Sequence, residues 1–245
     1  MSATTAVFKR EMKGYFGTPL AYVFLVIFLA GASFLTFRAN FFEFRDASLR
    51  LFFQQLPWLF ALLAPAIAMR MWSEERRSGT IELLLTLPVT LRQAVLGKFL
   101  AGWAFFGIAL LLTFSMVFTV AYLGTPDTGP IFTGYLGAFL MAGAYLAIGG
   151  FFSAITKNQV IAFILGVVVC GLFVIAGAPA VVSWLEQSSL VPTFLVRFIE
   201  SLSFLTNYEV MQLGMIEVSN LFFMLAITIG FLVGTVVMLN ETKAR

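Results

Sequence analysis

Long runs without Asp, Glu, Lys or Arg dominate the hydrophobic pattern of this 245-residue chain. A helix needs about 20 largely apolar residues to cross the hydrocarbon core of a bilayer. Six runs are long enough, and the pattern therefore predicts an all-α membrane protein with six transmembrane helices. The runs are residues 14–37, 51–69, 99–126, 128–156, 158–185 and 218–240.

Within a single transmembrane domain, 1–245, we expect the helices to occupy residues 18–37, 51–71, 93–122, 131–155, 159–178 and 218–240. The longer connection at 179–217 contains Pro179 and Pro192 and carries charges of both signs, which argues against a full span. Short helices that dip into the outer leaflet and a plain extracellular loop are both open interpretations of this segment.

A cleaved signal peptide is the competing interpretation of the first run. The sequence Ala30-Gly31-Ala32 loosely resembles a cleavage site. The apolar run is longer than a signal-peptide core, so we expect a retained first helix.

The composition supports a membrane protein. Hydrophobic residues make up 60% of the chain and charged residues 11%, against about 25% charged residues in a soluble domain. The 29 phenylalanines suit a lipid-facing surface. With one cysteine, Cys170, and no histidine, neither an internal disulfide framework nor a zinc or haem site is expected.

The basic residues indicate an orientation. Six spans place both termini on one side of the membrane, and that side would hold eleven of the 15 Lys and Arg residues. Because positive residues favour the cytoplasm, we expect both termini and residues 72–92 to be cytoplasmic. A net charge of +3 fits an anionic membrane surface better than nucleic acid. The eleven residues are Lys9, Arg10, Lys13, Arg70, Arg76, Arg77, Arg92, Lys98, Lys157, Lys243 and Arg245, and the other four are Arg38, Arg45, Arg50 and Arg197.

The first residues of the chain have an amphipathic pattern. Apolar side chains recur at helical spacing, while the basic residues lie on other faces. This pattern predicts an interfacial helix at residues 4–16, and an ordinary basic flank is the alternative. The apolar residues are Phe8, Met12, Tyr15 and Phe16, and the basic ones are Lys9, Arg10 and Lys13.

The connection at 72–92 carries several helix signals. Ser73 is expected to cap a short helix with Glu74 and Glu75 in its first turn, where carboxylates suit the helix dipole. Gly79 permits a turn, and Pro88 ends any helix. A folded helical element beside the membrane and a loop that only links two spans are both compatible with these residues.

Two further spacings concern the ends and the contacts of the spans. Thr90 and Gln93 have the spacing of a capping box at the start of the third span. Gly230 and Gly234 form a GxxxG pair in the last span, which allows close helix packing. That packing can lie inside one subunit or at a dimer seam.

Several chemistries lack their usual residues. No charged residue lies in the middle of a predicted span, which argues against an ion-coupled carrier. Gly97-Lys98 is followed by Phe99 and lacks the earlier glycine of a phosphate-binding loop. No G-x-S-x-G elbow occurs either. Any driving energy must therefore come from another subunit.

The run Glu-Glu-Arg-Arg-Ser-Gly-Thr-Ile-Glu-Leu-Leu-Leu-Thr-Leu-Pro-Val at residues 74–89 resembles a segment of the ABC-2 type permeases, the membrane subunits of a group of ATP-driven transporters. The resemblance covers nearly the whole chain and is nearest to the gliding-motility-associated subgroup. It implies the type V exporter-like architecture and a bacterial inner-membrane location.

The resemblance also implies the partners and the site. A separate ABC ATPase would bind ATP and Mg²⁺, this chain would bind no cofactor and hold no catalytic residue, and a second permease, identical or related, would pair with it. The N-terminal helix, through Lys9, Arg10 and Lys13, would also touch the ATPase. The coupling residues implied are Glu74, Glu75, Arg76, Arg77, Gly79, Thr80 and Glu82.

Three rival functions remain beside export. One is a membrane scaffold that uses the ATPase cycle for mechanical or signalling work. An intramembrane enzyme lacks a catalytic constellation, and a secondary carrier usually shows inverted repeats, of which none is evident here. Co-purification of an ATPase would separate the permease and the scaffold from the other two.

Overall fold

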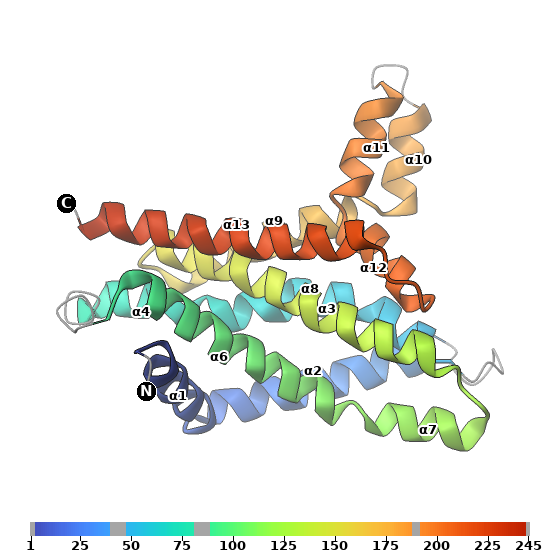
Figure 1. Cartoon of the computed structure of the whole chain (residues 1–245), viewed down its shortest axis with the longest axis horizontal. Helices are drawn as coiled ribbons and strands as arrows, with labels where there is room; N and C mark the ends of the chain where they lie inside the picture. The colour runs from blue at the N-terminus through green and yellow to red at the C-terminus, as the bar shows by residue number, and fades with distance from the viewer. Residues whose placement is uncertain (1–2, 40–47, 81–88, 188–191, 244–245) are drawn as a thin grey trace.

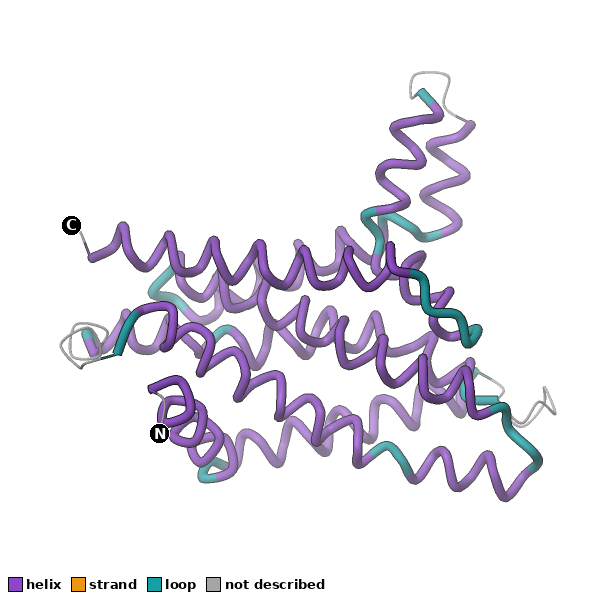
Figure 2. The backbone as a smooth tube through the Cα atoms, in the orientation of Figure 1, coloured by secondary structure: helices purple, strands orange, loops and turns teal. Residues whose placement is uncertain are grey.

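The computed structural model describes residues 3–39, 48–80, 89–187 and 192–243, and these residues contain helices and short connections but no strand (Figure 2). The all-α prediction is therefore confirmed for the described part of the chain. The helices are α1 (Ala3–Phe16), α2 (Pro19–Arg38), α3 (Arg50–Ala68), α4 (Arg70–Ser78), α6 (Leu91–Leu112), α7 (Ser115–Leu123), α8 (Thr128–Ile155), α9 (Gln159–Ile175), α10 (Pro179–Gln187), α11 (Thr193–Ser201), α12 (Phe204–Gln212) and α13 (Val218–Lys243).

The described residues contain five helical stretches that are long and apolar enough to cross a membrane. A sixth is obtained only if α9 and α10, which meet at an angle of 66°, count as one broken span. With 17 residues, α9 alone reaches the lower limit of about 17–25 residues for a span. The five stretches are Ala21–Arg38, Arg50–Ser78, Leu91–Leu123, Thr128–Ile155 and Val218–Glu241.

The long helices run side by side along the longest axis of the molecule (Figure 1). One end of this bundle carries α1, α4 and both chain termini, and we call it the α4 end. The opposite end carries α7 and α12, and we call it the α12 end. Beside the α12 end, the hairpin of α10 and α11 projects sideways from the bundle.

Helix α8 is the centre of the bundle. In the most apolar 18-residue window of each helix, 72% of α8 is buried inside the molecule and only 17% of α13. Glycines let neighbours approach α8 closely, since a Cβ on Gly134 would lie 2.5 Å from the Phe53 ring and one on Gly149 would lie 2.6 Å from Ala68. The sequence pattern of both helices is apolar throughout, so this difference comes from tertiary packing.

Phenylalanines join α2, α3 and α6 inside the bundle. The ring of Phe28 stacks on Phe60 with centroids 5.6 Å apart, and Phe60 meets Phe106 edge-on at 5.5 Å. Phe24 packs on Phe105 at the same centroid distance of 5.5 Å. The assignment of the phenylalanines to the lipid-facing surface was therefore wrong for these rings, because offset and edge-on ring packing fills the narrow space between helices.

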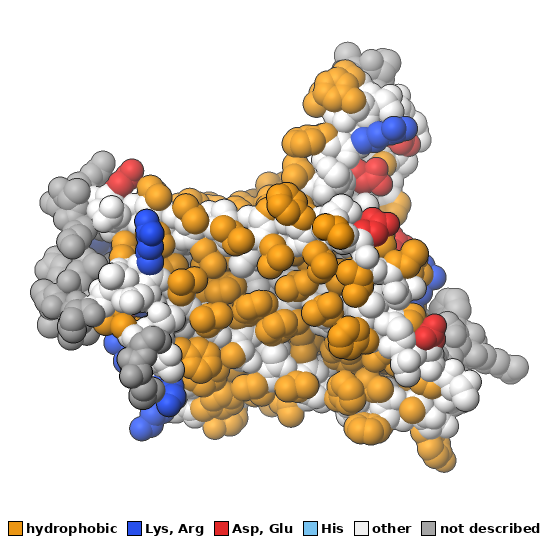
Figure 3. Space-filling model, in the orientation of Figure 1, with side chains coloured by type: hydrophobic (Ala, Val, Ile, Leu, Met, Phe, Trp, Pro, Cys, Tyr) orange, Lys and Arg blue, Asp and Glu red, His pale blue; other side chains and the backbone are white. Residues whose placement is uncertain are grey.

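The outer surface has an apolar belt. Hydrophobic side chains cover the middle of the visible face, with most Lys and Arg on the α4 side and most Asp and Glu on the α12 side (Figure 3). Many large hydrophobic side chains of the described residues are exposed, among them Leu111, Phe118 and Phe222, which are each about 70% exposed. A contiguous surface of this kind fits a lipid environment.

Neutral hydrogen bonds hold the α12 end together. The Tyr208 hydroxyl donates to the Gly134 carbonyl at 3.0 Å, and the Thr133 hydroxyl donates to the Met211 carbonyl at 2.6 Å. Ser203 caps α12 by accepting from the Leu205 amide and donates to the Val174 carbonyl at the end of α9. These contacts fix α12 between α8 and α9.

Candidate functional site

The junction of α3 and α4 is a break in one long helical stretch. The amides of Trp72 and Ser73 both donate to the Ser153 hydroxyl oxygen at 3.0 Å, and that hydroxyl donates to the Met69 carbonyl at 2.8 Å. A side chain of α8 thus takes the place of helix hydrogen bonds at the break. The direction in which α4 leaves the bundle is fixed by the last turn of α8.

The expected cap at Ser73 is wrong. Helix α4 begins at Arg70, so Ser73 is an interior residue, and its buried hydroxyl donates to the Met69 carbonyl four residues earlier. The side chain is satisfied within the helix, as is common for interior serines. The expected turn at Gly79 is confirmed, because this residue ends α4 in the left-handed region with φ +73°.

Lys98, on α6, is the centre of a charge network at the α4 end. Its side chain is 5% exposed, and its ammonium lies 2.9 Å from a Glu75 oxygen and 3.3 Å from a Glu11 oxygen. The same ammonium lies 5.1 Å from the centroid of the buried Trp72 ring. Arg10 completes the network, 2.8 Å from Glu11 and 3.7 Å from Glu75.

The network joins three helices that are remote in sequence. Glu11 comes from α1, Glu75 from α4 and Lys98 from α6. An unpaired ammonium at this depth would be costly, and the two carboxylates and the aromatic ring supply the compensation. Each helix therefore depends on the other two for its charge balance.

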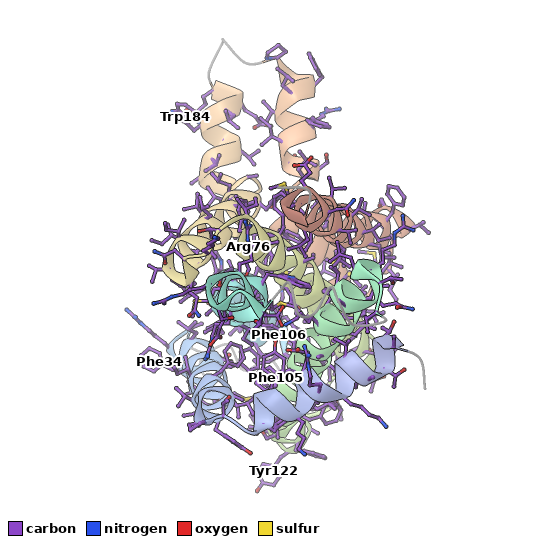
Figure 4. All side chains as sticks on the ribbon, turned by 90° about the vertical axis from the view of Figure 1, so that its left-hand side faces the viewer. Phe34, Arg76, Phe105, Phe106, Tyr122 and Trp184 are labelled. Atoms are coloured by element: carbon purple, nitrogen blue, oxygen red, sulfur yellow. The ribbon has the colours of Figure 1, made fainter. Side chains whose placement is uncertain are left out.

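Direct packing holds α1 against α6. A Cβ on Gly97 would lie 2.8 Å from the Val7 side chain and 3.0 Å from the Thr4 carbonyl oxygen. Only a glycine admits the α1 backbone at this distance. Seen from the α4 end, α1 lies across the bundle axis, with Phe105 and Phe106 drawn above it (Figure 4).

Arg76 ties α4 to the end of α8. Its guanidinium Nη1 donates to the Ala154 carbonyl in the last turn of α8, where a positive charge suits the helix dipole. Among the described residues, the buried Nε of Arg76 and the buried Oε2 of Glu75 have no hydrogen-bond partner. Both side chains therefore face the fold rather than solvent.

The other face of α4 is exposed. Glu74 and Arg77 lie on it, the exposed Thr80 follows shortly after the helix end, and Glu74 pairs with Arg70 one turn earlier at 3.1 Å. Arg10 is half-exposed on α1, where Lys9 and Lys13 are also exposed. We call Glu74, Arg77, Gly79 and Thr80 the outer face of α4.

The structure divides the seven residues implied for coupling into two groups. Glu75 and Arg76 belong to contacts inside the chain, whereas Glu74, Arg77, Gly79 and Thr80 lie on the outer face. The seventh, Glu82, lies outside the described residues. A sequence cannot separate the groups, because alternating charges in a short helix give no sign of which face meets the bundle.

Two other predicted features can be located. The capping box is confirmed. The main-chain N–H of Gln93 donates to the Thr90 hydroxyl oxygen, and the main-chain N–H of Thr90 donates to the side-chain oxygen of Gln93. In the GxxxG pair, Gly234 faces α8, where a Cβ on it would lie 3.1 Å from the Phe151 ring, whereas a Cβ on Gly230 would meet nothing within 4 Å. The two glycines therefore do not share one contact inside this chain.

Sequence reasoning missed the role of Lys98, which it considered only as one of the basic residues on the cytoplasmic side and as part of an absent phosphate-binding loop. A signal was present, since Lys98 lies two turns inside α6 and is followed by the apolar residues Phe99 and Leu100. A charge in that position needs a buried partner or a route to the interface. The partners, Glu11 and Glu75, are identified only by the fold.

A family model described as ABC-2 family transporter protein matches residues 15–243, from the last two residues of α1 to the end of α13. No protein among those with curated descriptions matches the sequence. The match covers most of the chain and does not divide the family into subgroups, so the gliding-motility-associated assignment stays a prediction.

Proposed function

Since the chain belongs to the ABC-2 family of transporter proteins and is therefore a membrane permease subunit of an ABC transporter, we propose that it exports its substrate with energy from a separate ATPase subunit. The permease itself is a transport component and not a catalyst. ATP and Mg²⁺ belong to the ATPase in this proposal, and the present chain binds neither.

The α4 end is the cytoplasmic side in this proposal. The support is the distribution of basic residues, which gather at that end, together with the positive-inside rule. Helix α1 then lies in the inner membrane interface, with Lys9 and Lys13 directed to solvent or lipid head groups. Both termini face the cytoplasm.

The observation that carries the coupling role is the two-sided character of α4. Its outer face is exposed and charged, while its inner face is tied to α8 through Ser153 and Arg76 and to α6 through Lys98. A force applied to the outer face by a closing ATPase dimer reaches the central helix through these contacts. Exposed charges suit the outer contact, because they set register in a reversible interface.

A second permease completes the transporter in this proposal. The support is the small buried share of α13 and α2, whose apolar windows are 17% and 33% buried inside this chain. Faces of this kind meet lipid or a second permease, which is either identical or a related chain. The substrate pathway then lies between the two permeases.

A charge reversal on the outer face tests the proposal. We expect the double variant Glu74→Lys with Arg77→Glu to lose retention of the co-expressed ATPase by about ten-fold in affinity purification. Thermal unfolding of the permease should be unchanged, since both side chains are exposed. Arg197→Glu, in the exposed hairpin beside the α12 end, is the matched control and should retain the ATPase fully.

Full ATPase retention by the double variant would contradict the outer face as the docking surface. Retention of the ATPase in the native chain without any ATP-dependent movement of solute in vesicles would favour the scaffold instead.

A further inference from the structure

A cavity of about 340 Å³ lies at the α4 end between α1, α2, α3 and the break before α4. This volume falls within the range of about 300–1,000 Å³ that small-molecule sites occupy. Its apolar part is lined by Ile27 of α2 and by Leu63 and Ile67 of α3. Glu11 and Lys98 of the charge network and Glu74 of the outer face of α4 also line this space.

The cavity opens toward the lipid-facing side of α2. Val23 and Ile27 line it, and they are 53% and 52% exposed. Both belong to the apolar stretch Ala21–Arg38, which is long enough to cross the membrane. A molecule in the bilayer thus reaches the cavity sideways, without passing through water.

The mouth of the cavity is polar and has no net charge. Arg70 and Glu74 line it as an ion pair at 3.1 Å, and Lys98 and Glu11 line it as a second pair at 3.3 Å. Each positive group therefore has a negative partner close by. An anionic ligand would add an uncompensated charge here, whereas a ligand with one charge of each sign would not.

The Tyr15 phenol is an additional polar group in the cavity. Tyr15 lines the cavity, and its ring stacks on Phe105 with centroids 5.4 Å apart. Burial raises the pKa of this phenol, so the hydroxyl stays neutral at physiological pH and keeps its proton as a donor. A bound phosphate oxygen would accept a hydrogen bond from this hydroxyl.

We propose that this cavity binds one phospholipid with an ethanolamine head group, taken from the adjacent leaflet. The lipid ammonium donates to the carboxylates of Glu11 and Glu74, and its phosphate accepts from Arg70 and the Tyr15 hydroxyl. The upper part of one acyl chain fills the apolar space beside Ile27. The cavity combines an apolar part, a lateral opening and a balanced pair of charges, which are the three features of such a lipid.

Assignment to the inner leaflet rests on the proposed function, because it requires the α4 end to be cytoplasmic. Binding itself does not depend on that orientation or on an ATPase. The lipid would occupy the space between α1 and the α3–α4 break, next to the path from the outer face of α4 to α8.

Native mass spectrometry of the delipidated full chain in detergent tests the proposal. The probes are palmitoyl-oleoyl phosphatidylethanolamine, phosphatidylglycerol and phosphatidylcholine, each titrated alone. We expect a single phosphatidylethanolamine to bind at least about ten-fold more tightly than either other lipid, since glycerol removes the positive charge and choline cannot donate hydrogen bonds. Equal binding of the three lipids would overturn the proposal.

Two variants locate the site. Ile27→Trp should fill the cavity and weaken phosphatidylethanolamine binding by about ten-fold, whereas its neighbour Val26→Trp, which is 64% exposed and does not line the cavity, should change it less than about two-fold. Tyr15→Phe keeps the ring stack and removes the hydroxyl, with an expected loss of about five-fold.

Unchanged binding in both Ile27→Trp and Tyr15→Phe would also overturn the assignment. Thermal unfolding of each variant shows that the chain is intact. Because the assay contains no ATPase, failure of lipid binding and failure of ATPase docking are separate results.

Discussion

The two ends of the bundle differ in the kind of polar contact that joins their helices. At the α4 end, α1, α4 and α6 are joined by the buried charges of Glu11, Glu75 and Lys98. At the α12 end, α12 is joined to α8 by neutral hydroxyls, with Tyr208 and Thr133 donating to main-chain carbonyls. Among the described residues, both ends bury polar groups, yet full charges are buried at the α4 end alone.

The two ends should also differ in how the remaining group is affected when its hydrogen-bond or ion-pair partner is removed. A helix carbonyl has two lone pairs and keeps its main-chain hydrogen bond when a hydroxyl is taken away. A carboxylate that loses its buried cation keeps a full charge in a poorly solvated place. The α12 end should therefore tolerate single losses, and the α4 end should fail as a unit.

The largest effect is expected for Lys98→Ala. This change leaves Glu11 and Glu75 without their buried cation and with the half-exposed Arg10 alone nearby, and breaking a buried ion pair costs about 3–5 kcal/mol. The free energy of unfolding in mixed micelles measures the loss. We also expect earlier proteolytic cleavage within α1.

A compensated variant separates charge balance from packing. Lys98→Met with Glu11→Gln and Glu75→Gln removes all three charges at similar volume, and stability should return to within about 1 kcal/mol of the native chain. If the triple variant were as unstable as Lys98→Ala, the network would owe its strength to packing rather than to charge.

The next largest effect is expected where α1 packs against α6. Gly97→Ala places a methyl group 2.8 Å from the Val7 side chain and 3.0 Å from the Thr4 carbonyl oxygen, and overpacking of this kind costs about 1–3 kcal/mol. Gly171→Ala in α9 is the matched control, because a Cβ there meets nothing within 4 Å and alanine favours the helix. The two midpoints of thermal unfolding should move in opposite directions.

A smaller effect is expected at the α12 end. Tyr208→Phe removes one neutral hydrogen bond to the Gly134 carbonyl and keeps the ring, so the loss should be about 1 kcal/mol. The same unfolding assay applies. A loss as large as that of Lys98→Ala would remove the contrast between the ends.

The smallest effect is expected for an exposed ion pair, and it shows how much a charge contributes to stability when it is not buried. Arg50 and Glu209 form an ion pair at the α12 end at 3.7 Å, with side chains 50% and 60% exposed. Exposed pairs contribute about 0.2–1 kcal/mol at most, so Arg50→Ala should barely change the unfolding midpoint. Raising the salt concentration should weaken this pair and leave the buried Lys98 network nearly unaffected.

Features that depend on neighbours in sequence could be predicted from the chain alone. The apolar runs indicate a helical membrane protein, because the bilayer thickness sets a minimum run length whatever the partners are. The capping box at Thr90 and the turn at Gly79 follow from local hydrogen bonding and backbone conformation in the same way. The run at 74–89 indicates the family before any fold is known.

Features that depend on which face of a helix meets the bundle needed the tertiary structure. Glu75 and Arg76 are one residue away from Glu74 and Arg77, yet one pair is tied to α6 and α8 and the other faces outward. The buried rings of α2, α3 and α6 belong to phenylalanines, and so do several of the exposed rings. The sequence of a helix that is apolar on all sides does not show which face packs inside the bundle, because lipid and protein interiors both favour apolar side chains. Glu11, Glu75 and Lys98 come together only through the packing of three helices. A buried charge is stable because oppositely charged groups from other helices lie next to it.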